Sequence, residues 1–465
     1  MAALVVAVAV AANAQTGGLG PPPFPNAQND GCQRSNVGLV SDASPEWVYV
    51  NRDSSPKFAS GVVSDSHLSH DDLSLNHKSY DFNADVTVDP AYTNLVGGNP
   101  TQKTGNFEPG GDEKVGALHI ERESGVYPFY AWPHDGDRVS VWGGWIWDCG
   151  HWSPGAISGP RDPSQPGEKT EIHPVRAIVS IRKDGTLAKD GQTQADAFIS
   201  SQGTFARAVE GCVLKHTPVD ADHYDAGYGP CKNDPANQLD PVNDTDYTFF
   251  IPAPARKPAG AKIKYTVIKR QSDNAPAVQV AIKTSPAGIQ VTVPFKSGGG
   301  AANGSFARTF LVGWSKPPKH KPQHLQLKLE SYKSLKALDP HPGHAGETST
   351  PPDEDVVTFD VNGLWSLLDT KAPKLLKIKK GQTVKLGKTL DVFTSKGLSI
   401  NVAGLECDAS VALLPCPNRP GATGLANDSL GEKDVRLSLR RAPGRHKIKS
   451  PDGTFVLTYS VKRKR

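Results

Sequence analysis

The chain has 465 residues, which is too long for one ordinary hydrophobic core and predicts about three domains. Hydrophobic residues make up 37% of it and charged residues 22%, a balance that excludes global disorder and supports buried cores. Its 45 glycines and 39 prolines favour short strands joined by turns over long helices, and no apolar run reaches the ~18–20 residues that a membrane-spanning helix needs.

The first segment, residues 1–14, has the pattern of a signal peptide. An apolar stretch leads into Ala-Asn-Ala, an A-x-A cleavage pattern that places the cut after Ala14. The charged residues that normally precede such a stretch are missing, so a buried strand or short helix is the alternative. Residues 15–39, which begin rich in Gly and Pro, then form a linker. We therefore expect a secreted, extracytoplasmic protein.

Six cysteines fit an oxidising compartment. None forms a C-x-x-C pair, so zinc-ribbon and thioredoxin-like interpretations have no support. Two pairs each close a short loop flanked by Gly, Pro and Asn, and they are the disulfides we expect: Cys212–Cys231 and Cys407–Cys416. Because six cysteines allow 15 pairings, the partners of the other two stay open: Cys32 and Cys149.

Residues 40–185 form the first predicted domain, and their periodicity is that of strands. Alternation of apolar and polar residues indicates three strands there: 117–123, 137–147 and 175–182. A short helix is expected over 89–96, with Asp89 as N-cap and Pro90 at its first position.

Two further domains, 190–315 and 323–465, hold candidate strands roughly ten residues apart, a spacing typical of β-sandwiches. A basic Pro-rich segment, 316–322, separates them as a stiff linker. The expected strands of the second domain are 245–251, 261–270, 276–283, 288–295 and 305–313. Those of the third are 324–332, 355–365, 397–406, 435–439 and 453–461, together with a lysine-rich pair.

Acidic residues of the third domain are expected in its loops: Asp339, Asp353, Glu354, Asp355, Asp408 and Asp428. Carboxylates from several loops at one end of a sandwich can supply the six to eight oxygens that calcium takes. No D-x-D-x-D-G run is present, and loop Asp residues are more often turn formers. Calcium in the third domain is therefore the weaker of the two interpretations.

The net charge of +4 is unevenly spread. From residue 311 onward there are 26 Lys and Arg against 15 Asp and Glu, a balance of +11 that leaves −7 for residues 1–310. The runs 374–380 and 440–449 carry much of the excess. An extracellular polysaccharide or another anionic surface is a possible partner, and the alternative is a solvated strand face. No aromatic residue interrupts 374–380 to stack on bases, so nucleic acid is not expected.

The segment from His67 to His173 holds seven of the fourteen histidines and five of the eight tryptophans. Glu171 and His173 are two residues apart, so on a strand they share one face. The candidate metal ligands are Asp148, His151, Glu171, His173, His77 and Asp81. A set of carboxylates and imidazoles without thiolates suits a divalent metal of the Zn, Mn or Fe type, which could activate water for hydrolysis.

A polar cluster without metal is the competing interpretation, because a carboxylate beside a histidine also satisfies two buried polar groups. The tryptophans likewise allow a functional and a structural interpretation. Exposed rings could stack on sugars, whereas buried rings would belong to the core. The rings in question are Trp142, Trp145, Trp147 and Trp152.

The sequence from 136 to 174 resembles a segment of uncharacterised bacterial exported proteins that carry a "GD-R-V-x-V-x-G-x-W … H … E-I-H-P" pattern. The matching residues are Gly136, Asp137, Val139, Val141, Gly144, Trp147, His151, Glu171, Ile172, His173 and Pro174, while Asp148 falls one place early. The resemblance covers about a tenth of the chain. It implies a small OB-like barrel and no established activity.

These patterns predict a mostly β chain with a small N-terminal OB-like β-barrel followed by two β-sandwich domains. The leading functional hypothesis is a binding or structural role at the cell envelope or on extracellular material, by analogy of fold. The alternative is a secreted metal-dependent hydrolase. No G-x-S-x-G, H-E-x-x-H or nucleotide-binding motif is present, and ligand and oligomeric state stay open.

Overall fold

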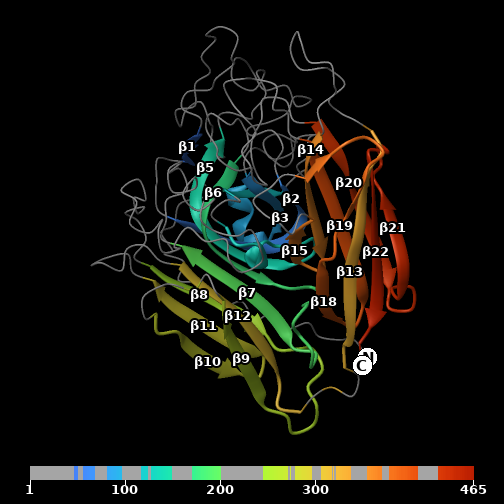
Figure 1. Cartoon of the computed structure of the whole chain (residues 1–465). Helices are drawn as coiled ribbons and strands as arrows, with labels where there is room; N and C mark the ends of the chain where they lie inside the picture. Colours follow the sequence, from blue (N-terminus) through green and yellow to red (C-terminus); the bar gives the residue numbers. More distant parts are fainter. Residues whose placement is uncertain are drawn as a thin grey trace.

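The computed structural model shows a chain built almost wholly from strands (Figure 1). The structure describes residues 47–50, 56–68, 81–96, 117–123, 127–148, 170–200, 245–270, 273, 278–295, 305–316, 318, 321–336, 353–368, 376–406 and 428–464. The predicted leader, the linker that follows it and all six cysteines lie outside these ranges. Within them, no helix is long and apolar enough to cross a membrane.

Five strands close into a barrel. They are β2 (Lys57–Leu68), β3 (Asp81–Val88), β4 (Leu118–Glu123), β5 (Arg138–Asp148) and β6 (Thr170–Ile181). The pairs β2–β3, β3–β4, β2–β5 and β5–β6 are antiparallel, and a parallel β4–β6 pair completes the ring. A closed five-stranded barrel with this non-sequential strand order is of the OB type, which confirms the predicted OB-like β-barrel.

Side-chain alternation explains which face of the barrel wall is the core. On β3, Phe82, Ala84 and Val86 are buried, whereas Thr87 is exposed beside the exposed Val62 of β2. Successive side chains of a strand point to opposite faces, so the even-numbered positions of β3 line the interior. Three short elements flank the barrel: β1 (Trp47–Tyr49), which pairs with β5, and the 3-10 helices η2 (Pro90–Leu95) and η4 (Phe129–Ala131).

The sheet of the barrel continues into a β-sandwich, because β6 also pairs with β7. The further strands are β7 (Thr193–Ser200), β8 (Thr245–Pro252), β9 (Ile263–Lys269), β10 (Ala281–Ser285), β11 (Gly288–Phe295) and β12 (Ser305–Trp314). One sheet runs β6-β7-β12-β9 and the other β10-β11-β8, with Phe249, Val291 and Phe310 in the core between them. Strand β6 is buried along both faces, since Ala177 and Val179 belong to this core as well.

A second sandwich follows, as predicted. Its first sheet holds β13 (Gln323–Ser334), β17 (Thr383–Lys385), β18 (Thr389–Thr394), β21 (Gly444–Lys449) and β22 (Phe455–Arg463). Its second sheet holds β14 (Asp353–Val361), β15 (Leu364–Leu367), β16 (Leu376–Ile378), β19 (Gly397–Glu406) and β20 (Asp428–Ser438). Alternate residues such as Leu327, Phe359 and Tyr459 fill the core between the two sheets.

The expectation that the acidic residues of this domain lie in loops was wrong where the structure describes them. Asp353, Glu354 and Asp355 open strand β14, and Asp428 opens β20. Asp355 is buried and accepts a hydrogen bond from the Tyr332 hydroxyl at 2.7 Å, so its side chain serves the core. These residues lie at one end of the sheet, where Asp355 stands opposite Glu406 and Glu406 opposite Asp428, and not in the loops that the calcium interpretation named. Asp339 and Asp408 lie outside the described residues.

Candidate metal centre

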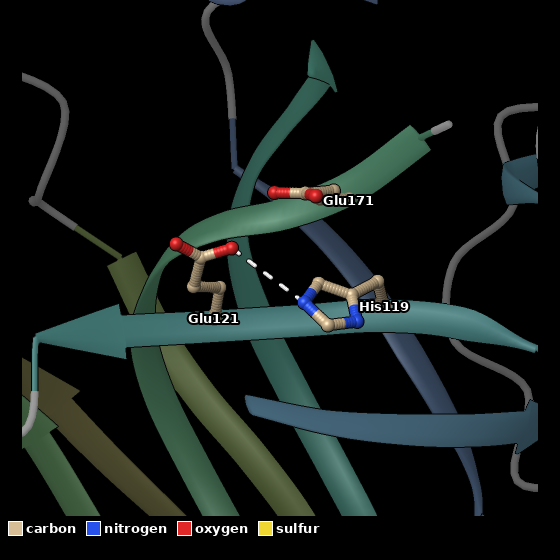
Figure 2. A group of neighbouring side chains, drawn as sticks. All are labelled: His119, Glu121 and Glu171. Atoms are coloured by element: carbon tan, nitrogen blue, oxygen red, sulfur yellow. Dashed lines mark ion pairs between the residues drawn. The ribbon is translucent and has the colours of Figure 1, made fainter. Parts of the chain in front are cut away.

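The parallel strands β4 and β6 each carry a histidine and a glutamate two residues apart. Strand β4 has His119 and Glu121, and β6 has Glu171 and His173. The register places His119 opposite Glu171. Because residues two apart share a face of a strand, the four side chains gather on one side of the barrel wall. Figure 2 shows three of them, His119, Glu121 and Glu171, turned toward one another.

This side is the outer wall of the barrel. Thr87 is exposed, Asp85 is two residues from it on β3, and Asp85 stands opposite His119. The outer position does not leave the cluster open to solvent. His119 retains 2% of its accessible surface, Glu121 8% and Glu171 1%. Ionisable groups buried to this extent need compensation by hydrogen bonds, opposite charge or a metal ion.

The distances form a connected network. His119 Nδ1 lies 3.0 Å from Asp85 Oδ1, and its Nε2 lies 3.5 Å from Glu121 Oε2. His173 Nδ1 lies 3.4 Å from Glu171 Oε2 and 3.7 Å from Glu121 Oε1. One ligand atom from each of His119, Glu121 and Glu171 can be chosen so that all lie within 4.8 Å of one another.

The donor chemistry fits a divalent metal ion. A carboxylate on Nδ1 orients the His119 ring so that Nε2 faces Glu121, and a histidine held by a carboxylate in this way is the arrangement that supports metal-bound histidines in proteins. One imidazole nitrogen and two carboxylates suit borderline metals such as zinc, manganese or iron. Glu121 and Glu171 would be the direct oxygen ligands, with Asp85 behind the histidine.

The third domain borders this region. His67 Nδ1 lies 3.0 Å from Asp65 Oδ2 on the same outer wall. Burial lowers the pKa of His67, but the bond to Asp65 more than offsets this and the pKa is raised. Glu432 of β20 lies close enough to interact electrostatically with both Asp65 and His67. Burial raises the pKa of Glu432, and the bond donated by Asn401 opposes it.

Of the six predicted ligands, the structure brings together Glu171 and His173. Asp148 ends β5 and Asp81 begins β3, but their side chains lie outside the described residues, as do His77 and His151 entirely. His119, Glu121 and Asp85 were missed. The signal for the first two was present, since His-x-Glu on a predicted strand has the same spacing as Glu-x-His on β6.

Two of the four tryptophans proposed to stack on sugars have described side chains, and both pack against other residues. Trp145 is 6% exposed, and its Nε1 donates to the Leu95 carbonyl at 3.0 Å. Trp142 packs against Phe58 at 4.6 Å between ring centroids and against Tyr247 at 5.6 Å. Trp145 is therefore part of the core, whereas Trp142 is half-buried and packs against two rings. The side chains of Trp147 and Trp152, and the expected disulfides, lie outside the described residues.

Comparisons with known proteins give little. No protein-family model matches the chain, and no curated protein matches it. Solved structures that resemble parts of it include "Extended-Synaptotagmin 2, C2A- and C2B-domains, calcium bound", with 11% identity over 30% of this chain and 46% of that one, at a TM-score of 0.21. "Structure of Drosophila C2-DSL-EGF1" has 9% identity over 30% of this chain and 66% of that one, at 0.19.

A third resemblance, to "Extended-Synaptotagmin 2, SMP - C2A - C2B Domains", covers 88% of this chain and 60% of that one, with 8% identity and a TM-score of 0.22. The chain thus spans less than two thirds of the length of each of these structures. At such TM-scores the resemblance carries no functional argument.

Proposed function

We propose that this chain is an exported binding protein whose OB-type barrel holds a divalent metal ion between His119, Glu121 and Glu171. The observation that carries the proposal is the 3.0 Å contact between Asp85 and His119 Nδ1, which turns Nε2 toward Glu121, while one ligand atom each of His119, Glu121 and Glu171 lies within 4.8 Å of the others. The ion would supply positive charge to a buried group of three carboxylates. It would also tie β4 to β6 at the parallel pair that closes the barrel.

Burial favours a binding or structural metal over the hydrolase alternative. Catalytic zinc keeps an open coordination position for water and substrate. Here each of the three ligands keeps less than a tenth of its accessible surface. Closed sites of this kind stabilise a fold and contribute directly to its folding free energy. Oligosaccharide-binding OB barrels use the wall formed by their second and third strands, which here are β3 and β4. That correspondence supports a binding role on extracellular material.

Metal binding is tested on the full chain by elemental analysis and thermal unfolding. We expect a stoichiometric transition metal, a melting temperature that falls when a chelator is added, and its recovery when zinc or manganese is returned. His119→Ala and Glu171→Gln should each lose the metal and become insensitive to chelator, because a site of three or four ligands rarely survives the loss of one.

The matched control is His324→Ala. His324 pairs with Asp391 at 2.9 Å in the third domain, so the variant also breaks a His–Asp contact but leaves the residues of the metal centre untouched. It should keep both the metal and the chelator response. A wild-type protein without stoichiometric metal, and with the same melting curve in chelator, would show a polar cluster only.

Export is tested separately. Protein expressed with its own leader should be recovered outside the cytoplasm and should begin at Gln15, because the A-x-A pattern places the cut after Ala14. N-terminal sequencing or intact mass measures this directly. Recovery of the uncut chain from the cytoplasm would contradict the expectation without affecting the metal proposal.

A further inference from the structure

The sheet that contains β13, β22 and β21 covers the third domain on the side away from the barrel. In Figure 1, β21 lies at the right-hand margin of the molecule, whereas the barrel strands lie near its centre. One face of this sheet packs on the core through residues such as Leu327, Leu457 and Ile448. The opposite face is therefore the outer surface of the sandwich.

The outer face of this sheet is strongly basic. Among the residues that alternate with the buried ones, six are exposed and basic: Lys328, Lys333, Lys385, Arg445, Lys447 and Lys449. We call these six side chains the basic face. Glu330 shares this side of the sheet and forms an ion pair with Arg445 at 2.8 Å. The excess of cations here accounts for much of the positive charge of the third domain.

The register arranges the basic face in three rows. Through the neutral residues of β22, Arg445 aligns with Lys328 by way of Ser460, and Lys449 aligns with Lys333 by way of Val456.

The middle row aligns Lys447 with Lys385, by way of Thr458 of β22 and Ser331 of β13. In each row one cation comes from β21 and the other from β13 or β17. The result is two columns of positive charge on either side of a neutral strip formed by Val456, Thr458 and Ser460 of β22.

The spacing suits a linear polyanion. Strands lie about 4.8 Å apart and residues of one face recur about every 6.8 Å along a strand. A chain of regularly spaced anions lying along β22 would meet cations on both flanks at each step. The opposite outer face of the sandwich has other chemistry, since Glu432 and Asp434 of β20 are acidic and Asp360 of β14 forms an ion pair with His134 of the barrel segment.

We propose that the basic face binds an acidic polysaccharide, one that carries carboxylate or sulfate groups along its chain. Nucleic-acid binding of single strands uses aromatic rings that stack on bases, and none of the aligned outward residues of the three rows is aromatic. Lipid surfaces favour exposed apolar side chains as well as charge. The two exposed large hydrophobics of the described chain, Val62 and Tyr265, lie on other strands. A hydrophilic polyanion fits the face best.

The test uses the full chain with heparin and polygalacturonate as probes and neutral dextran as the uncharged comparison. The variant Lys447→Glu/Lys449→Glu removes most of one column. Its matched control, Lys264→Glu/Lys269→Glu, makes the same change of charge at exposed positions of β9 in the second domain. We expect salt-sensitive binding of at least one acidic probe, weakened about tenfold or more by the β21 variant and little by the control.

Lys447→Gln/Lys449→Gln checks that the effect is local charge and not misfolding, and it should weaken binding by less than the Glu variant with an unchanged melting curve. Equal losses in the β9 control would reduce the effect to net charge and overturn the proposal. Absence of binding to both acidic probes would overturn it too, as would preferential binding of single-stranded DNA or anionic vesicles. Chelator should change nothing, so this result is independent of the metal centre.

Discussion

His134 is a buried histidine at the contact between the barrel segment and the third domain. Its Nδ1 forms an ion pair with Asp360, which is fully buried, and its backbone N–H donates to Asp137 at 3.0 Å. Asp137 also receives an ion pair from Arg182 at 2.8 Å, and Arg182 reaches Asp196 at 2.6 Å. His134 and Arg182 therefore compensate the negative charges of three buried aspartates, Asp360, Asp137 and Asp196.

Titration of His134 should make stability depend on pH. Burial lowers the pKa of His134, but the charge and hydrogen bond of Asp360 outweigh this, and the charges of Asp137 and Asp135 add to them, raising the pKa to about 9. The folded state thus holds a proton that the unfolded chain releases near 6.5. The contribution of protonated His134 to the free energy of unfolding is on the order of 3 kcal/mol. It is complete below pH 6.5 and is lost as the pH rises through about 9.

Chemical denaturation at pH 6 and pH 9.5 measures that change. Asp360→Asn should lower stability at pH 6 and flatten the decline toward pH 9.5, because His134 then loses its main partner. His324→Ala, which removes a half-buried histidine of the third domain, is the control and should keep the wild-type slope. An equally steep decline in Asp360→Asn would refute the assignment to this pair.

At the scale of elements, period-two alternation predicted most strands of the two sandwiches and three strands of the barrel. It failed for β2 and β3, whose sequences contain Ser, Asp, Asn and Gly, residues that usually indicate turns. These strands form because their polar residues occupy the outer wall while Ala84 and Val86 face inward. Strand β2 also shifts register between Val63 and Asp65, which interrupts its alternation.

The helix expected after Asp89 is present as the 3-10 helix η2, with Asp89 at the N-cap position and Pro90 first as predicted, but the Asp89 side chain makes no capping bond. Its carboxylate accepts a hydrogen bond from Ser60 Oγ of β2 at 2.5 Å and forms an ion pair with Arg138 of β5. Tertiary partners therefore replaced the local capping bond. A short-range pattern correctly placed the element, whereas the partner of its first side chain depended on strands distant in sequence.

For the candidate site too, the sequence predicted what depends on local spacing and missed what depends on the pairing of distant strands. The same-face relation of Glu171 and His173 is local and follows from their spacing. Their approach to His119 and Glu121 depends on the parallel pairing of β4 with β6, which joins segments separated by β5. No pattern within either strand specifies its neighbour, so the second half of the cluster required the closed barrel.

At the scale of the whole molecule, the third domain is fastened to the barrel side by specific contacts. Trp365 of β15 is 3% exposed, and its Nε1 donates to the Pro133 carbonyl at 3.2 Å. Its ring packs against Trp132 and Phe82, with centroids 5.6 and 5.8 Å away. A backbone bond from Phe393 to Thr186 at 3.1 Å and the ion pair of Lys396 with Asp184 at 3.3 Å lie elsewhere on the same contact.

Loss of the Trp365 ring should uncouple the third domain from the rest of the chain. Trp365→Ala removes a large buried side chain and leaves the Pro133 carbonyl without this donor, at a cost of about 3–5 kcal/mol. We expect the wild type to unfold in a single transition and Trp365→Ala to unfold in two, one of which belongs to the third domain. Calorimetry combined with limited proteolysis measures both changes.

Trp314→Ala is the matched control, because Trp314 also donates its Nε1 to a carbonyl, that of Pro254 at 3.1 Å, but within the second domain. It should lower stability without creating a separate transition for the third domain. Trp365→Phe keeps most of the ring packing and should lie between the wild type and Trp365→Ala. If Trp365→Ala unfolds in the same single step as the wild type, the contact does not couple the two parts, and the backbone and ion-pair contacts around Phe393 and Lys396 must be sufficient to hold them together.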